Sequence, residues 1–197
     1  MSLSHHNYPP GSQAAPEFSL QERRSLLILA HQAILSEAGK REFADVPRLP
    51  HFEEPRGVFT TIYLHGALRG CVGYAFAVKA LYDTIAETAR ASAFDDVRFP
   101  PVTKDEALIL EISLSILSRL QPIVPDQIEV GRHGLLITQN GCRGLLLPQV
   151  PVEYGWDRIT FLEQTCQKAG LPPEAWRSGA GIQAFTAEIF GDRDADY

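Results

Sequence analysis

The sequence predicts an α+β domain built on a mostly antiparallel, mixed sheet that is flanked by helices. Two hairpin signals occur in the chain, and amphipathic helical patterns separate them without the regular strand–helix–strand alternation of a parallel fold. The chain has 197 residues, of which 45% are hydrophobic and 21% are charged. These values are typical of a globular domain rather than of a disordered chain.

We divide the chain into a leader, residues 1–18, and a single domain, residues 19–197. The start of the leader is rich in Ser, His, Pro, Gly and Ala, a composition typical of disordered segments. Ser19-Leu20-Gln21-Glu22 is a capping-box sequence, and apolar residues follow it at helical spacing as far as Gly39. The first helix is therefore expected to begin near residue 19 and to end at Gly39.

The middle of the chain predicts a hairpin followed by a second helix. Gly57–Leu64 is rich in β-branched and aromatic residues, and His65-Gly66 suits a two-residue turn into the return strand Ala67–Gly73. The second helix covers the apolar positions from Leu81 to Ala93.

The second half of the chain predicts a strand, a hairpin, a third helix and a last strand. The first strand alternates strictly between apolar and polar residues, and Asn140-Gly141 is a strong hairpin-turn signal. The four elements are expected at Leu108–Leu117, at Gly134–Thr138 with Arg143–Leu147, around residues 162–170, and at Ile182–Phe190.

Composition excludes several functional classes. Lys and Arg total 18 and Asp and Glu total 24, so the net charge is −6 and we expect no nucleic-acid partner. No apolar run approaches the roughly 20 residues that span a bilayer, so we expect no membrane partner. Three cysteines without a Cys-x-x-Cys pair favour the reducing cytoplasm. The sequence also lacks phosphate-loop and dinucleotide motifs and metal-ligand spacing, so we expect neither a cofactor nor a metal.

Cys71 is the candidate nucleophile. Because side chains alternate along a strand, Arg69 and Cys71 are expected on one face, where the guanidinium would favour the thiolate. Gly70 and Gly73 would let a ligand approach the backbone. The competing interpretation is an inert buried thiol, with Arg69 bracing the sheet through Glu111.

Four further residues are candidates for proton transfer or ligand binding. His133 precedes a strand and could act as a general base with Glu111, although a loop histidine is more often a turn residue. Arg98 and Arg143 could bind an anionic ligand. The structural alternatives are that Arg98 pins a loop through Asp96 and that Arg143 packs its aliphatic stem.

The string Leu68-Arg69-Gly70-Cys71-Val72-Gly73 resembles the hallmark of the AMMECR domain family, whose prokaryotic members are called AmmeMemoRadiSam system protein A. The similarity runs from about Ser19 to near the C-terminus. The sequence differs at Val72, Val97 and His65, where isoleucine, proline and asparagine are usual in the family. The other matching segments are Asp96-Val97-Arg98-Phe99-Pro100-Pro101, Glu111-Ile112-Ser113, His133-Gly134-Leu135, Gly144-Leu145-Leu146-Leu147-Pro148-Gln149-Val150, Gly155-Trp156-Asp157 and Cys166-Gln167-Lys168-Ala169-Gly170.

The resemblance implies a larger and a smaller subdomain with the Cys71 motif at the cleft between them. It also implies association with a Memo-like protein and with a radical S-adenosylmethionine enzyme, but it supplies no reaction. Two hypotheses follow. One is a cleft that binds a small anionic ligand and carries a thiol that alkylates faster than Cys142 or Cys166. The other is a non-catalytic adaptor for those two partners. A homodimer stays open as the oligomeric state.

Overall fold

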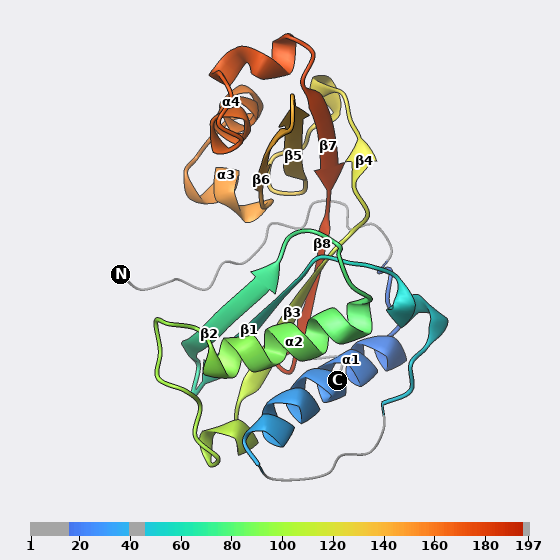
Figure 1. The fold of residues 1–197 in the computed structure, drawn as a ribbon, viewed down its shortest axis with the longest axis vertical. Coiled ribbons are helices and arrows are strands. Elements are labelled where there is room, and N and C mark those ends of the chain that lie inside the picture. The colour runs from blue at the N-terminus through green and yellow to red at the C-terminus, as the bar shows by residue number, and fades with distance from the viewer. Residues whose placement is uncertain (1–15, 40–45, 195–197) are drawn as a thin grey trace.

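The computed structural model describes residues 16–39 and 46–194, and in it the chain forms two lobes. Each lobe contains one four-stranded antiparallel sheet, which confirms the α+β class but gives two sheets in place of one. The strand orders are β2-β1-β3-β8 in the larger lobe and β4-β7-β5-β6 in the smaller lobe (Figure 1).

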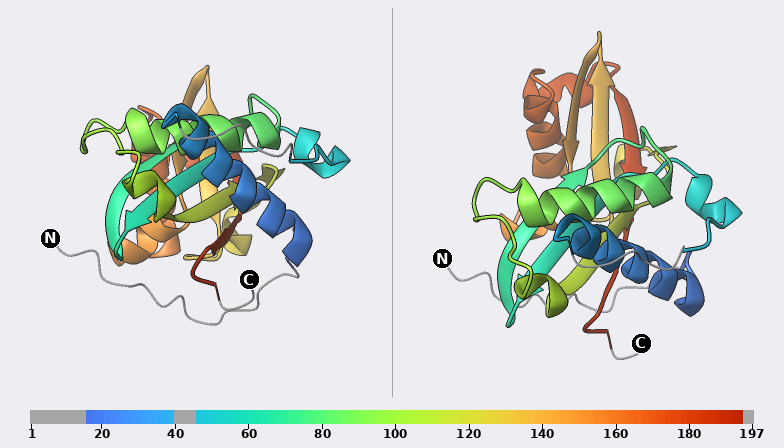
Figure 2. Two further views of the ribbon diagram at one scale, coloured as in Figure 1. Left: turned by 90° about the horizontal axis from the view of Figure 1, so that it is seen from below. Right: turned by 60° about the horizontal axis from the view of Figure 1, so that its bottom comes forward.

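The larger lobe packs two helices against one face of its sheet (Figures 1 and 2). Its core is made by the apolar residues of these helices and of every second strand position, such as Ile112 and Leu114. The capping box of Ser19 and Glu22 is confirmed at the start of the first helix. The elements are α1 (Leu20–Glu37), β1 (Val58–Leu64), β2 (Ala67–Tyr74), α2 (Leu81–Phe94), β3 (Glu111–Leu117) and β8 (Ala187–Gly191), with short 3-10 helices at Pro50–Glu53 and Glu106–Leu108.

The smaller lobe has a hydrophobic core of its own, in which Phe161 and Leu162 are fully buried against the sheet. The predicted hairpin at Asn140-Gly141 and the third helix are both confirmed. The elements are β4 (Gln121–Pro122), β5 (Gly134–Gln139), β6 (Cys142–Leu146), α3 (Gln149–Glu153), α4 (Arg158–Lys168) and β7 (Gly181–Phe185), with 3-10 helices at Pro125–Gln127 and Pro173–Arg177.

Two chain crossings join the lobes. The chain leaves the larger sheet after β3 and returns where β7 continues into β8 (Figure 1). At the junction the Ser118 amide donates to the Thr186 carbonyl at 2.8 Å, and the Thr186 amide donates to the Ser118 hydroxyl at 2.9 Å. The strand predicted at Ile182–Phe190 is therefore wrong as a single element, because Thr186 divides it between two sheets.

Two other boundaries differ from the prediction. The strand expected from Leu108 begins only at Glu111, because residues 106–108 form a 3-10 turn that leaves Leu108 exposed. Phe18, at the end of the expected leader, is buried and stacks on His51. Residues 1–15 lie outside the described part of the chain. Among the described residues, no helix combines the length and apolar character needed to cross a bilayer.

Candidate functional site

A β-bulge at Arg69 breaks the alternation of faces along β2. Ile62 pairs with Gly70 and Tyr63 pairs with Leu68, so Arg69 is an extra residue in β2. Its guanidinium is directed to the segment after α2, where it donates to the Pro100 carbonyl at 2.9 Å and contacts the Glu106 carboxylate at 3.2 Å. The prediction that Arg69 and Cys71 share a face is wrong. It assumes that side chains alternate between faces along all of β2, and the bulge at Arg69 interrupts this alternation.

Cys71 lies on the face of the larger sheet that points away from α1 and α2, which we call the second face. It pairs with Thr61, whose neighbours Thr60 and Ile62 are fully buried beneath the helices. The Thr61 hydroxyl donates to the Cys71 sulfur at 3.3 Å, and the thiol remains partly exposed.

Two side chains that follow α2 hold the backbone of Cys71. The Asp96 carboxylate accepts from the Cys71 amide at 2.9 Å, and the Arg98 guanidinium donates to the Cys71 carbonyl at 3.2 Å. Asp96 is buried, whereas about half of the Arg98 side chain is exposed. The guanidinium that contacts Cys71, through its carbonyl, is therefore that of Arg98.

Asp96 and Arg98 form a strong ion pair. Hydrogen bonds from Arg98 hold the pKa of the Asp96 carboxyl well below its usual range, and the Cys71 and Arg98 amides lower it further. The same pairing raises the pKa of Arg98, and the nearby Cys71 adds a smaller increase. Two nitrogens of Arg98 make these bonds, while Nη1 makes no hydrogen bond with any described residue.

The two motif glycines allow close packing within the fold. A Cβ on Gly70 would lie 2.0 Å from the Ser92 carbonyl oxygen, so the end of α2 can approach β2 only at a glycine. A Cβ on Gly73 would lie 2.3 Å from the Phe59 ring. Both contacts are internal, and neither one is a contact with an open ligand-binding surface.

Hydroxyl groups accompany the thiol on the second face. On β3, Ser113 pairs with Thr61 of β1 and Ser115 pairs with Phe59 of β1. The side chains of both serines therefore point to the same side of the sheet as Cys71. Both serines are partly buried, and neither side chain makes a hydrogen bond with a described residue. This face therefore offers hydroxyl donors, a thiol and, at its edge, a guanidinium.

The other predicted site residues have partners of their own. Glu111 pairs with Arg193, and it lies two strands from Cys71 on β3, about 10 Å across the sheet. His133, in the smaller lobe, accepts from the Glu129 amide at 3.0 Å through Nδ1. Burial lowers the pKa of His133, and Arg132 adds to this effect. No hydrogen bond among the described residues joins either side chain to Cys71.

Arg143 bridges the lobes. Its guanidinium carbon lies 4.6 Å from the centre of the Phe76 ring, which follows β2. An arginine over an aromatic face is attracted by the ring's quadrupole, so this contact stabilises the arrangement of the two lobes. Arg143 is exposed on the edge strand of the smaller sheet, and its described contact is with this ring rather than with the residues around Cys71.

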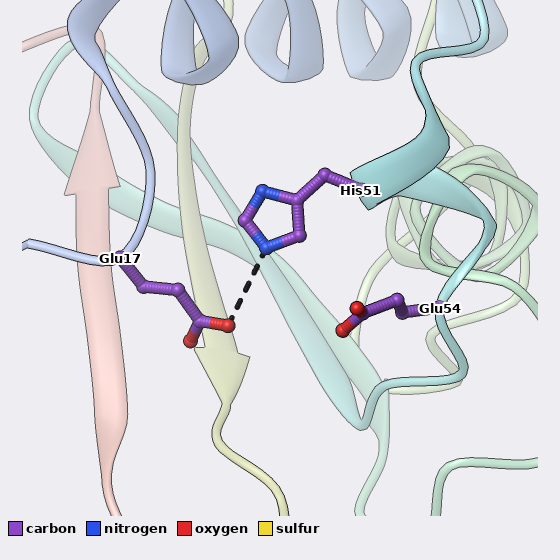
Figure 3. Close-up of side chains that lie close together, drawn as sticks. All are labelled: Glu17, His51 and Glu54. Atoms are coloured by element: carbon purple, nitrogen blue, oxygen red, sulfur yellow. Dashed lines mark hydrogen bonds and ion pairs between the residues drawn. The ribbon is translucent and has the colours of Figure 1, made fainter.

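Glu17, His51 and Glu54 form the one group of acidic and histidine side chains in the described residues whose spacing resembles a metal site (Figure 3). The Arg56 guanidinium lies between the two carboxylates, bonding Glu17 and contacting Glu54 at 2.9 Å. A buried arginine already supplies the positive charge that these carboxylates require. The group is therefore an ion-pair network, and His51 adds a 3.4 Å contact to Glu17.

Two hollows lie where the lobes meet. The smaller one, about 150 Å³, lies beneath Phe185 of the smaller lobe and Leu117 of the larger lobe. The larger one, about 470 Å³, is a shallow depression over the ion-pair network of Arg56. Neither hollow is lined by residues 68–73 of the motif, so the motif and these hollows are separate features of the molecule.

Two contributors to the surroundings of Cys71, Thr61 and Asp96, do not follow from the local sequence pattern. Thr61 was assigned to a strand, but its pairing with Cys71 depends on the register of the hairpin, which the bulge sets. The sequence predicts that Asp96 pins a loop through Arg98, and the structure adds a bond from the Cys71 amide to the Asp96 carboxylate. The signal that could have found Asp96 is its position directly after an amphipathic helix that must pack back onto β2.

Comparisons with known proteins agree in describing one family. The AMMECR1 family model matches residues 27–190. Protein Mbar_A1807 of Methanosarcina barkeri is 41% identical over 88% of this chain and 91% of its own length. Protein MK0488 of Methanopyrus kandleri is 38% identical over 91% of this chain and 93% of its own. The crystal structure of the uncharacterized protein PH0010 from Pyrococcus horikoshii is 39% identical, covers 85% of this chain and 90% of that chain, and has a TM-score of 0.65.

Proposed function

The chain belongs to the AMMECR1 family, and from that premise we propose that it binds a small anionic ligand beside Cys71, on the second face of the larger sheet. One observation carries the proposal. Asp96 and Arg98 bond to the amide and the carbonyl of Cys71, and the thiol of the same residue stays partly exposed.

The charge and the donors favour an anion. Arg98 is half exposed, its guanidinium is oriented by Asp96, and its Nη1 is free of hydrogen bonds with the described residues. A guanidinium held in a fixed orientation suits a carboxylate or a phosphate, to which the N–H groups of the remaining nitrogen, Nη1, can donate. The hydroxyls of Ser113 and Ser115 lie along the same face and can donate to further oxygens.

The thiol is proposed as the reactive group of this site. A cysteine reacts as the thiolate, which a nearby guanidinium favours. In the proposed arrangement Arg98 takes the role that the sequence suggested for Arg69, while Glu111 and His133 are engaged elsewhere. The proposal therefore assigns ligand binding to Arg98 and the thiol chemistry to Cys71.

Two alkylating reagents of opposite character test the proposal. Iodoacetate carries a carboxylate and iodoacetamide does not, and with each of them the sulfur displaces iodide to form a carbon–sulfur bond. In the full chain, Cys71 is expected to react with iodoacetate faster than Cys142 and Cys166, as followed by peptide mass spectrometry. The ratio of the iodoacetate rate to the iodoacetamide rate at Cys71 is expected to fall about two- to fivefold in Arg98→Gln, the range for a partly exposed charge pair.

The matched control is Arg143→Gln, which removes an exposed guanidinium from the other lobe and should leave the ratio unchanged. Equal ratios in the wild-type protein and in Arg98→Gln would remove the anion site. Labelling of Cys71 that is equal to or slower than labelling of Cys142 would remove the thiol from the mechanism. Titration of phosphate and of succinate, followed by thermal shift, extends the test to noncovalent binding.

A second candidate function, an adaptor for a Memo-like protein and a radical S-adenosylmethionine enzyme, is favoured by Val97. This side chain is 99% exposed, between Asp96 and Arg98 in a segment that Arg69 also holds in place. An apolar residue presented by a rigid segment loses little entropy on binding a partner. A pull-down with both proteins at micromolar concentration tests this function, and Val97→Asp should abolish capture. Absence of capture by the wild-type protein would contradict it.

A further inference from the structure

Asp96 joins Cys71 and Arg98 into one hydrogen-bonded unit. Its Oδ2 accepts from the Cys71 amide at 2.9 Å and from Nη2 of Arg98 at 2.7 Å. Its Oδ1 accepts from the Arg98 amide at 3.2 Å and from Nε of Arg98 at 2.9 Å. Because Nη2 of Arg98 also donates to the Cys71 carbonyl at 3.2 Å, the three residues close a ring.

The ring holds the guanidinium of Arg98, which would otherwise be mobile because the side chain is half exposed to solvent. An exposed arginine side chain samples many rotamers, and holding it in one of them costs conformational entropy. Two parallel bonds to a single carboxylate fix both the position and the plane of a guanidinium. Asp96 is itself fixed, because its side chain is 94% buried and it follows directly after α2 and its C-cap residue Asp95.

We infer that Asp96 is the positioning residue of the proposed site, and that it sets the preference for anions by holding the guanidinium of Arg98 against the Cys71 carbonyl. This inference rests on the proposed function. Asp96 acts through Arg98, because its own four accepted hydrogen bonds leave its carboxylate no free direction toward a ligand.

Asp96→Asn distinguishes a positioning role from a simple effect of charge, because the two roles predict opposite changes in the preference of Cys71 for iodoacetate. If Asp96 only contributed its negative charge, removing that charge would leave Arg98 uncompensated, and the preference of Cys71 for iodoacetate would rise. If Asp96 positions Arg98, the amide of Asn cannot hold both guanidinium nitrogens, and the preference would fall. A purely structural role would leave the preference unchanged while the protein is folded.

The experiment measures the ratio of iodoacetate to iodoacetamide rates at Cys71 in the full chain carrying Cys142→Ser. The expected result is a fall of about two- to fivefold in Asp96→Asn, to the level of Arg98→Gln, with no further fall in the double variant. Ser92→Ala is the matched control. It removes the bond accepted from the Val72 amide at 2.9 Å and the bond donated to the Thr60 carbonyl at 2.7 Å, neither of which involves Arg98, and it should leave the ratio unchanged.

A second variant keeps the inference testable if Asp96→Asn fails to fold. Arg98→Lys preserves the positive charge on an exposed residue but lacks the planar fork that pairs with Asp96. Positioning predicts that the ratio in Arg98→Lys falls to the level of Arg98→Gln, and a ratio that stays at the wild-type level overturns the inference. An unchanged or increased ratio in folded Asp96→Asn also overturns it. A wild-type ratio equal to that of Arg98→Gln would instead overturn the proposed function.

Discussion

The carboxylate of Asp96 lies 2.9 Å from the amide nitrogen of Cys71, in the position that a neighbouring strand would occupy at the edge of the larger sheet. The Val72 amide is satisfied differently, because the Ser92 hydroxyl accepts from it at 2.9 Å and donates at 2.7 Å to the carbonyl of Thr60, its partner on β1. Asp96, in the loop after α2, thus caps an amide of the edge strand β2 that would otherwise be open to pairing with another chain.

Substitutions of Arg69 and Arg98 should have different effects on the reactivity of Cys71. Arg69→Met removes the bonds to the Pro100 carbonyl and to Glu106, so it should lower the free energy of unfolding by about 1–3 kcal/mol. Arg98→Gln leaves the buried Asp96 carboxylate without its charged partner and should also cost about 1–3 kcal/mol. Urea unfolding checks both values. The iodoacetate preference of Cys71 should change only in Arg98→Gln, and a change in Arg69→Met would contradict the placement of Arg69 away from the thiol.

Acid should weaken the unit that Asp96 holds together. The pKa of Asp96 is lowered in the folded protein by Arg98, so its contribution to stability is complete above the unfolded value of 3.8 and is lost as pH falls below it toward the folded pKa. Urea unfolding from pH 6 to pH 3 should therefore show a smaller loss of stability in Asp96→Asn than in the wild-type protein. Parallel curves for the two proteins would contradict the lowered pKa.

Gly70→Ala should damage the larger lobe. The new Cβ would meet the Ser92 carbonyl oxygen at 2.0 Å, and because both groups belong to backbone, α2 must move away from β2. We expect a loss of at least about 1–3 kcal/mol, the range for overpacked cores. Gly181→Ala is the control, since its nearest contact is the Thr138 side chain at 2.9 Å, which can shift. Equal thermal stability of the two variants would refute the close approach.

His133 should make stability depend on pH near neutrality. Burial lowers its pKa from the ordinary 6.5, so the folded state favours the neutral ring, whose Nδ1 accepts from the Glu129 amide. The unfolded chain binds the proton more readily, and this contribution to stability is lost as pH falls through 6.5. His133→Asn retains an acceptor but does not titrate, so it should lose less stability than the wild-type protein between pH 7 and pH 5. Circular dichroism melts at both pH values check this difference.

Local sequence signals predicted the elements that depend on local geometry. His65-Gly66 and Asn140-Gly141 both form turns with positive φ, as the two-residue hairpins required. The capping box and the apolar periodicity placed α1 and α2 correctly. These features follow from interactions within a few residues, so one sequence is enough to specify them.

Features that depend on pairing between distant segments were not predictable in this way. Regular alternation placed Arg69 beside Cys71, whereas the bulge directs Arg69 toward Pro100 and leaves Arg98 as the guanidinium near the thiol. Alternation also joined β7 and β8 into one strand, because Thr186 changes sheets without any Gly or Pro to mark the change. In both cases the sequence pattern is regular and only the partner strand reveals the irregularity.

The chain enters the smaller lobe at Ser118 and leaves it at Thr186, and these two residues are hydrogen-bonded neighbours. Each lobe has its own hydrophobic core. Such an arrangement lets the smaller lobe be excised or exchanged as a cassette, because a short linker could reconnect β3 to β8 without rethreading the larger sheet. The larger lobe, which carries Cys71, Asp96 and Arg98, is therefore the natural minimal fragment in which to test the proposed ligand site.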